Sequence, residues 1–510
     1  MTSSKRILSL ILTMLMIPPI LAACDHKGPA EIPAETPATE PTTGGETEDA
    51  TEPSTEETEL GAESFPTDSP FAFSDGAMTA DVLRAYCSRA VTLAGFCMEG
   101  IEEDPIFEED LRMLLNVGAK FVGRAAYYSW SGYLTKKQVE SHFAKAAERA
   151  KAAHEADPEM ILQAGVFEII YDKTVNAIPI PAYVFEAFGL TPEKRNFKYA
   201  DMVFKTGQYA ESNNYWGISG SAVPDITQTE TQMYFYWMIS QYIDAGFESI
   251  HLGQAELMAR YSQPNFKHWD TVTTLARAYA KEHARRGLVL FDCHTAIDSA
   301  GMKVGNRLIC DMVGAGLVPS ETYHQDGAYQ CEVTDYYTCW LSWVGRSHGG
   351  RHPLGFDVEQ NFTLMEFDNY GGNGNPNVST PDAFYNWGYD DITWYALQPS
   401  WYRDQFLVET DEFLKKTELS SKGEQQYFLQ PACRRVLTAR PEPMTYTVQE
   451  KENMVEILIL LQKEQVQIKR DGLTMEITVT KDYRANNPSD ACPHGFGQED
   501  TIRKLFLGEE

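Results

Sequence analysis

The stretch Asp244-Ala245-Gly246-Phe247-Glu248-Ser249-Ile250-His251-Leu252-Gly253-Gln254 shows the pattern on which the fold of this chain depends. A helical pattern ends at a glycine, and a short apolar run follows that ends in polar residues. Glycine just past a helix end is the expected cap, and apolar runs between helices are typical of parallel strands covered on both faces. The pattern recurs at 116–118 before residues 119–124, and at 285–287 before residues 288–292. The sequence therefore predicts an α/β fold with a parallel sheet.

Eight apolar runs are predicted as strands of this sheet. They lie near residues 91–97, 119–124, 160–167, 247–254, 287–292, 307–312, 363–368 and 392–397. Eight strand–helix units make a (β/α)8 TIM barrel, which is the fold class we predict. An open doubly wound sheet is the alternative, although no GxGxxG or phosphate-binding loop follows the first strands. For strand 7 the run 354–358 competes with 363–368, which we prefer because Thr380-Pro381-Asp382 has the pattern of a helix start before strand 8.

Two pairs of residues have the spacing of a capping box, namely Thr135 with Gln138 and Thr227 with Glu230. Each predicts the start of a helix. The first helix should run over residues 135–156. The second is rich in aromatic residues, and we expect it to pack in the core.

Polar side chains gather where the predicted strands end. They are Glu99, Arg124, Glu168, Gln254, Glu256, Asp292, His294, Asp311, Glu366, Asp368 and Trp394. Active sites of TIM barrels are built at the C-terminal ends of the strands. Single surface acids are commonplace, so the convergence of many of them on one rim is what indicates a site.

Glycoside hydrolysis needs one carboxyl group with a raised pKa and a second that is ionised. Residues from about 80 to 420 resemble a glycoside hydrolase-type TIM barrel. The resemblance implies that Glu256, after strand 4, is the acid/base and that Glu366 or Asp368, on strand 7, is the nucleophile or base. The chain departs from that clan at Ala255, because the clan has asparagine directly before its strand 4 glutamate.

The other residues of the rim are expected to bind the carbohydrate substrate or to tune the acids. These are Arg124, Glu168, Gln254, Asp292, His294, Asp311 and Trp394. We expect no cofactor. A metal-dependent hydrolase using Asp292 and His294 is one alternative, although no HxH or HExxH motif accompanies them. A non-catalytic glycan-binding lipoprotein on a degenerate barrel is the other.

The first residues have the pattern of an export signal. Lys5 and Arg6 precede the apolar run 7–20, which is shorter than the roughly 20 residues of a spanning helix. Leu21-Ala22-Ala23-Cys24 resembles the lipobox of bacterial lipoproteins, which implies cleavage before Cys24 and lipid on its thiol. We therefore expect a lipid-anchored protein on the extracytoplasmic face of a cell membrane, and membrane contact through that anchor only.

The composition is acidic throughout. The net charge is −30, and residues 25–68, with thirteen acids and one lysine, are too poor in apolar side chains to fold. The remainder is acidic in its own right, so nucleic acid is not an expected partner. Eight cysteines follow Cys24 without a CxxC pair, and the sequence does not decide whether they form disulfides.

The predicted organisation has four parts. They are a signal peptide (1–23), a disordered tether (24–68), a TIM-barrel domain (69–430) and a C-terminal appendage (431–510). Residues 172–225 should form an insertion after strand 3. A closing helix is expected near 401–416, β-type alternation marks 445–482, and a short helix is expected over 499–507.

Overall fold

The computed structural model describes most of the chain from residue 68 onward. The described residues are 68–98, 105–130, 132–206, 218–259, 266–294, 302–317, 319–323, 329–333, 348–369, 390–396, 400–416, 420–437, 444–450, 453–462, 465–470, 473–478 and 482–509. Cys24 with the signal and tether, Glu99, and the helix start expected at Thr380 lie outside them. Within the described ranges, no helix combines the length and the apolar character needed to cross a membrane.

The centre of the molecule is a parallel sheet, as the sequence predicts. Its strands are, in spatial order, β17 (Ala432–Val436), β1 (Ala90–Leu93), β2 (Phe121–Ala126), β3 (Ile161–Gly165), β6 (Ser249–His251) and β7 (Leu290–Asp292). These six are parallel to one another, and β22 (Asp482–Arg484) adds an antiparallel edge beside β17. The protein is thus a mixed α/β protein built on parallel strands.

A second parallel sheet continues the first at both ends. It consists of β10 (Met312–Gly316), β15 (Phe362–Glu366) and β16 (Tyr427–Gln430). A parallel bridge between His294 and Gly314 links the end of β7 to β10. Pro431 alone separates β16 from β17, and its carbonyl accepts a hydrogen bond from Thr92 of β1 at 2.9 Å. A backbone bridge therefore links the two sheets on one side, and on the other side the chain itself runs from β16 through Pro431 into β17, which pairs with β1.

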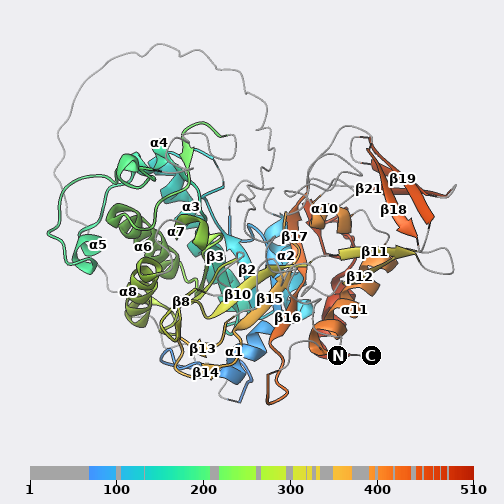
Figure 1. The fold of residues 1–510 in the computed structure, drawn as a ribbon, viewed down its shortest axis with the longest axis horizontal. Coiled ribbons are helices and arrows are strands. Elements are labelled where there is room, and N and C mark those ends of the chain that lie inside the picture. The colour runs from blue at the N-terminus through green and yellow to red at the C-terminus, as the bar shows by residue number, and fades with distance from the viewer. Residues whose placement is uncertain are drawn as a thin grey trace, which may run out of the picture.

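Helices flank the strands (Figure 1). Figure 1 shows α3 (Lys136–Ala156), α6 (Thr229–Asp244) and α8 (Lys267–His283) on one side, with α2 (Pro105–Val117) and α11 (Ser400–Lys416) on the other. Their apolar faces and the buried strands form one large core. The shorter helices are α1 (Ala80–Cys87), α4 (Asp172–Ala177), α5 (Ala182–Ala187), α7 (Ala255–Ala259), α10 (Asp391–Ala396) and α12 (Glu499–Leu507).

Local signals decide where several helices begin and end. The capping box of Thr135 and Gln138 is present at the start of α3. Gly118 and Gly246 have positive φ just past the ends of α2 and α6, as expected for left-handed caps. Gly287 also has positive φ, but it lies in the turn after α8, whose C-cap is Ala284 in an extended conformation, so the helix end expected at Gly287 is wrong. The capping box expected at Thr227 is wrong. Helix α6 begins at Thr229, and the Thr227 hydroxyl donates to Asp225 at 2.7 Å, which holds Thr227 in the preceding turn.

Strand 7 is confirmed as β15, but two other predicted strands are wrong. Residues 391–396 form helix α10 because the Asp390 carboxylate accepts the Thr393 N–H at 2.9 Å and caps the helix. Two later strands, β16 and β17, pair in parallel with β15 and β1 respectively. Strand 6 begins five residues later than expected, at Met312, since Arg307–Leu308 is β9 in a small side sheet with β8 (Lys303–Val304).

The remaining elements are small. The side sheet is completed by β13 (Gly350–Arg351) and β14 (Asp357–Val358), and β4 (Ile170–Tyr171) pairs with β5 (Ser221–Ala222) across the insertion that contains the short 3-10 helix Tyr199–Asp201. A hairpin and an antiparallel sheet follow later in the chain: β11 (Pro319–Tyr323), β12 (Tyr329–Val333), β18 (Met444–Glu450), β19 (Asn453–Gln462), β20 (Gln465–Arg470) and β21 (Leu473–Thr478). The six cysteines whose side chains are described are buried free thiols: Cys87, Cys97, Cys293, Cys310, Cys433 and Cys492.

Candidate active site

Arg124 is the residue around which the site is built. It lies in β2 with a φ of 56°, a left-handed conformation that side-chain-bearing residues rarely adopt. The pairing of β2 with β3 shifts register between Val122 and Ala126, so Arg124 sits on a bulge that aims its side chain. Backbone strain of this kind persists where the surroundings enforce it and is often found at functional sites.

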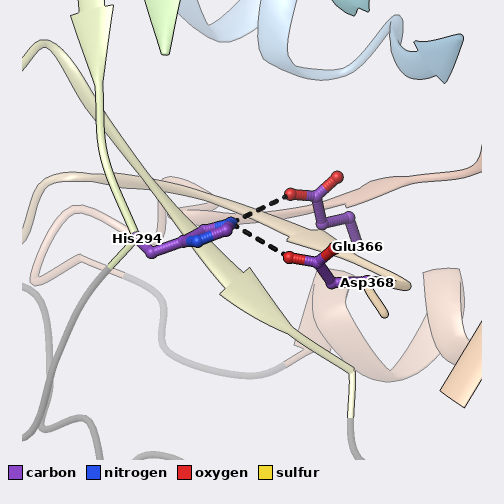
Figure 2. Close-up of side chains that lie close together, drawn as sticks. All are labelled: His294, Glu366 and Asp368. Atoms are coloured by element: carbon purple, nitrogen blue, oxygen red, sulfur yellow. Dashed lines mark ion pairs between the residues drawn. The ribbon is translucent and has the colours of Figure 1, made fainter. Parts of the chain in front are cut away.

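The guanidinium of Arg124 binds three side chains from two other strands. Its Nη2 lies 2.5 Å from Glu366 Oε1 and 2.6 Å from His294 Nε2. Its Nη1 donates to Asp368 Oδ1 at 3.1 Å. Figure 2 shows His294, which follows β7, pointing between the carboxyl groups of Glu366 and Asp368 from the end of β15. The structure thus brings four of the residues predicted from sequence into one cluster.

Both carboxyl groups of the cluster are held ionised. Burial raises the pKa of Glu366, but the charge of Arg124 and the contact with His294 outweigh it and lower that pKa to about 2. Burial likewise opposes the ionised form of Asp368, while Arg124 and Arg435 bring its pKa well below the ordinary value. Glu366 is almost fully buried, whereas the side chain of Asp368 keeps 23% of its surface exposed. Asp368 and His294 are therefore the parts of the cluster that a ligand meets first.

His294, Glu366 and Asp368 also have the geometry of a metal site, because their ligand atoms lie within 4.8 Å of one another. Arg124 Nη2 lies 2.6, 2.5 and 3.3 Å from the nearest atoms of these three residues. A positively charged nitrogen thus already occupies the position that an ion would take. These side chains are therefore arranged to bind the guanidinium of an arginine, which stabilises their ionised form, rather than to coordinate a metal ion.

Asp292, at the end of β7, lies beside this cluster in a different environment. Gln163 Nε2 donates to its Oδ1 at 2.8 Å, and His251 Nδ1 lies 3.0 Å from its Oδ2. Burial and the negative charge of Glu366 raise the pKa of Asp292 to about 8, although His294 and Arg124 oppose the shift. Burial lowers the pKa of His251 well below its ordinary value. Asp292 is therefore protonated at neutral pH, next to carboxylates that are ionised.

Glu168 and Gln254 are held together at the same end of the strands. The backbone N–H and the side-chain amide of Gln254 donate to the Glu168 carboxylate at 3.1 and 3.3 Å. Gly253 has a φ of 56°, and a Cβ there would come within 2.4 Å of Glu168 Oε2. Only glycine permits this close approach. Burial raises the pKa of Glu168, and the charges of His294 and Asp368 reach it.

Two residues expected in the site, Asp311 and Trp394, lie elsewhere. Asp311 precedes β10 at its amino end, where its carboxylate binds Arg277 at 2.8 Å and the Phe291 N–H at 2.7 Å, so its assignment to the rim is corrected. Trp394 lies in α10, buried against Phe406. Glu256 is buried at the start of α7, shortly after the end of β6, and its charge acts on Cys293 between Asp292 and His294.

Sequence reasoning missed several residues that hold the cluster. Arg435 of β17 donates to Asp368 and to Asn369 Oδ1, and Thr92 of β1 donates to Glu366 Oε2 at 2.8 Å. Gln163 and His251 lie inside strands. Because they fall within runs that we treated as apolar, alternation along those strands was the available signal.

Aromatic rings lie close to the polar residues. Phe167 packs edge-on against Tyr127, Trp130 and His251, with ring centroids 5.6, 6.5 and 5.6 Å away. Tyr127 and Trp130 are partly exposed. Tyr127 and Trp130, which follow β2, therefore lie at the carboxyl end of the sheet.

No protein-family model and no curated protein matches this sequence. Solved structures with a partial likeness include a GH27 β-L-arabinopyranosidase from Geobacillus stearothermophilus, with a TM-score of 0.32 and 8% identity over 78% of this chain and 96% of that one. A trehalose-6-phosphate hydrolase from Bacillus licheniformis gives 0.28 and 9% over 45% and 49% of the two chains. An α-galactosidase from Thermus thermophilus gives 0.26 and 12% over 46% and 44%.

These solved structures are glycoside hydrolases. The matched part of this chain spans about half the length of the trehalose-6-phosphate hydrolase and of a debranching enzyme from Nostoc punctiforme. Likeness at this level does not establish a shared activity.

Proposed function

We propose that this chain is a carbohydrate-active hydrolase, a glycoside hydrolase that works with two carboxyl groups at one end of its parallel strands. The observation that carries the proposal is the state of Glu366 and Asp368. Both project from the carboxyl end of β15, and Arg124 holds both ionised beside the protonated Asp292. Neighbouring carboxyl groups with pKa values pushed apart are what acid–base hydrolysis of a glycoside requires.

We further propose that the strands form one closed barrel. The spatial order β1, β2, β3, β6, β7 follows the chain without the reversal that marks a doubly wound sheet. The bridge from His294 to Gly314 on one side, and the direct continuation of β16 through Pro431 into β17 on the other, support closure. In a barrel, the carboxyl ends of all strands face one mouth, which is where such enzymes bind substrate.

The residues then divide into roles. An ionised Glu366 or Asp368 stabilises the positive charge that develops at the anomeric carbon, or attacks it. Arg124 keeps that group ionised and fixes its direction. Tyr127 and Trp130 offer ring faces on which a sugar can stack. The exposed edges of Asp368 and His294 can form hydrogen bonds with hydroxyl groups of the sugar.

A non-catalytic glycan-binding protein is the second candidate. It is favoured because both carboxylates already accept hydrogen bonds within the protein. Glu366 accepts from Arg124 and Thr92, and Asp368 accepts from Arg124 and Arg435. A carboxylate whose oxygens are all engaged is a weaker nucleophile. Such a cluster would still present hydrogen-bonding edges to a sugar.

We also propose that the enzyme is anchored to a membrane by lipid on Cys24 and faces outward. A flexible tether of about 44 residues has a root-mean-square span of roughly 35–40 Å. This reach would place the site clear of the lipid surface, within range of polymers outside the membrane.

Replacing Glu366 by Gln tests the catalytic proposal. We expect loss of hydrolysis across a panel of glycans and aryl glycosides, with retained circular dichroism, because Gln preserves shape without the charge. Glu140→Gln, an exposed position on α3, is the matched control and should hydrolyse normally. Unchanged hydrolysis in Glu366→Gln contradicts the proposal. Glycan binding without hydrolysis in the unmodified protein supports the second candidate instead.

A further inference from the structure

The two carboxylates of the cluster differ in how their oxygens are engaged. In Glu366, Oε1 accepts from Arg124 Nη2 at 2.5 Å and Oε2 accepts from the hydroxyl of Thr92 at 2.8 Å. The side chain of Glu366 is only 5% exposed. Each of its oxygens therefore has a donor, and little of its surface is left for a ligand. This carboxylate is placed to hold the guanidinium of Arg124.

Asp368 is held through one of its two oxygens. Its Oδ1 accepts from the backbone N–H of Asn369 at 2.7 Å, from Arg124 Nη1 at 3.1 Å and from Arg435. The backbone N–H of Asp368 donates to Asp391 Oδ2 at 2.8 Å, which fixes the main chain just past the end of β15. Three donors on one oxygen fix the plane of the carboxylate, so the direction of the second oxygen, Oδ2, is fixed as well.

The second oxygen of Asp368 has only weak contacts with the described residues. Arg124 Nη2 and His294 Nε2 each lie 3.3 Å from Oδ2. A guanidinium Nη carries two hydrogens, and Arg124 Nη2 makes shorter contacts with Glu366 Oε1 at 2.5 Å and His294 Nε2 at 2.6 Å. Its contact with Oδ2 must therefore share a hydrogen with one of these. Because arginine only donates, His294 Nε2 is the acceptor in that pair and has no proton to give to Oδ2.

Asp368 is also the carboxylate that a ligand can reach. Its side chain is 23% exposed, against 5% for Glu366. The ring of His294 is 25% exposed, and Figure 2 shows it directed at both carboxyl groups. The partly exposed rings of Tyr127 and Trp130 lie at the same end of the strands. A sugar that stacks on these rings would approach the cluster from the side of Asp368.

We propose that Asp368, rather than Glu366, is the nucleophile of this site, with Oδ2 as the reacting atom and Glu366 as a positioning residue that acts through Arg124. The inference rests on the proposed glycosidase function. Oδ2 forms a bond to the anomeric carbon while the bond from that carbon to the glycosidic oxygen breaks. The electron pair leaves with the glycosidic oxygen, which takes a proton from a carboxylic acid of the enzyme. Water then gives its hydroxyl to the anomeric carbon and its proton to that acid, and the electron pair of the broken bond returns to Oδ2.

Chemical rescue of variants separates the nucleophile from its positioning residue. Asp368→Ala should lower kcat on a p-nitrophenyl glycoside at least about 10³-fold. Sodium azide should then raise its rate at least about tenfold and give a glycosyl azide of inverted configuration, because azide attacks from the vacated place of the carboxylate. Glu366→Ala should also lose activity, but azide should leave its rate unchanged. Asp357→Ala, at an exposed position of β14, is the matched control and should hydrolyse normally. Rescue of Glu366→Ala and not of Asp368→Ala overturns the inference.

Trapping of the glycosyl–enzyme in the full-length wild type supplies a second readout, which decides the question even if Asp368→Ala does not fold. The probe is the 2-deoxy-2-fluoro glycosyl fluoride of whichever sugar the wild type releases from a panel of p-nitrophenyl glycosides. Its fluoride departs without a proton, and the fluorine at C2 slows release of the sugar. Mass spectrometry of proteolytic peptides should find the sugar on Asp368. A label on Glu366, or hydrolysis with inversion and no label, overturns the inference while leaving the glycosidase proposal intact. A wild type that hydrolyses no glycoside overturns both.

Discussion

Replacing Arg124 by Gln removes the cation on which the cluster depends. Glu366 then keeps Thr92 and His294 as neighbours, while Asp368 keeps Arg435. The variant leaves a buried carboxylate without its countercharge, which is the situation that makes single removals from buried ion pairs costly, by about 3–5 kcal/mol.

The magnitude follows from the electrostatics of Glu366. Its pKa is lowered from 4.5 to about 2, and each pKa unit corresponds to about 1.4 kcal/mol, so the ionised form gains about 3 kcal/mol in the folded state. Solvent screening reduces this little, because the side chains of Arg124 and Glu366 are only 7% and 5% exposed. We expect Arg124→Gln to lose about 3 kcal/mol of unfolding free energy at pH 7.

The stability difference between wild type and Arg124→Gln should also change with pH. In wild type, the contribution of Glu366 is present above its unfolded pKa near 4.5 and is lost as the pH falls through about 2. Without Arg124, burial raises the folded pKa of Glu366, so protonation relieves the variant as the pH falls. The deficit of Arg124→Gln should therefore be largest at neutral pH and shrink toward pH 4.

Urea unfolding followed by tryptophan fluorescence, at pH 7 and at pH 4.5, measures both effects. Lys136→Gln is the control, because it breaks an exposed pair with Glu140 at 3.4 Å and should cost less than about 0.5 kcal/mol. A deficit for Arg124→Gln below about 1 kcal/mol at pH 7, or one that grows toward pH 4.5, would refute the view that Arg124 neutralises a buried carboxylate pair.

Three further substitutions test other parts of the site and its location. Gly253→Ala should lower the unfolding free energy by about 1–2 kcal/mol in urea unfolding, because φ is 56° and the new Cβ meets Glu168 Oε2. Wild-type stability would contradict the close approach of Gly253 to Glu168. Gly314→Ala should keep wild-type stability within about 1 kcal/mol in urea unfolding, since its new Cβ would lie 3.4 Å from His294 Cδ2 and 3.7 Å from Asp292 Oδ2 without overlap; a larger loss would contradict this packing. Cys24→Ala should abolish incorporation of an alkyne-labelled fatty acid, and labelling that persists in the variant would remove the lipobox assignment.

Part of the fold is readable from the sequence because it is local. The glycines before apolar runs, and the capping box at Thr135, act within a few residues, and they correctly placed α3 and the strands β2, β6 and β7. The same locality explains the failures. An aspartate cap turned residues 391–396 into a helix, and nothing near 427–436 distinguished strands that are completed by pairing with β15 and β1.

The site shows the same division. Arg124, Asp292, His294, Glu366 and Asp368 were recognised because polar residues at strand ends share one edge of a parallel sheet. The sequence did not show which of their carboxyl groups are ionised. Whether a carboxyl group is ionised depends on burial and on charges that are distant in sequence, such as the pairing of residue 124 with residue 366 across 242 positions.

The sequence by itself determined the parallel α/β class, the strand-end acids, the acidic surface and the expectation of a lipid anchor at Cys24, since composition and short-range pattern decide each of these. Only the tertiary structure decided that Arg124 ionises Glu366 and Asp368 while Asp292 keeps its proton. The physical reason is that the free energy of a buried charge is set by the few ångströms around it, and folding brings those neighbours from distant parts of the chain.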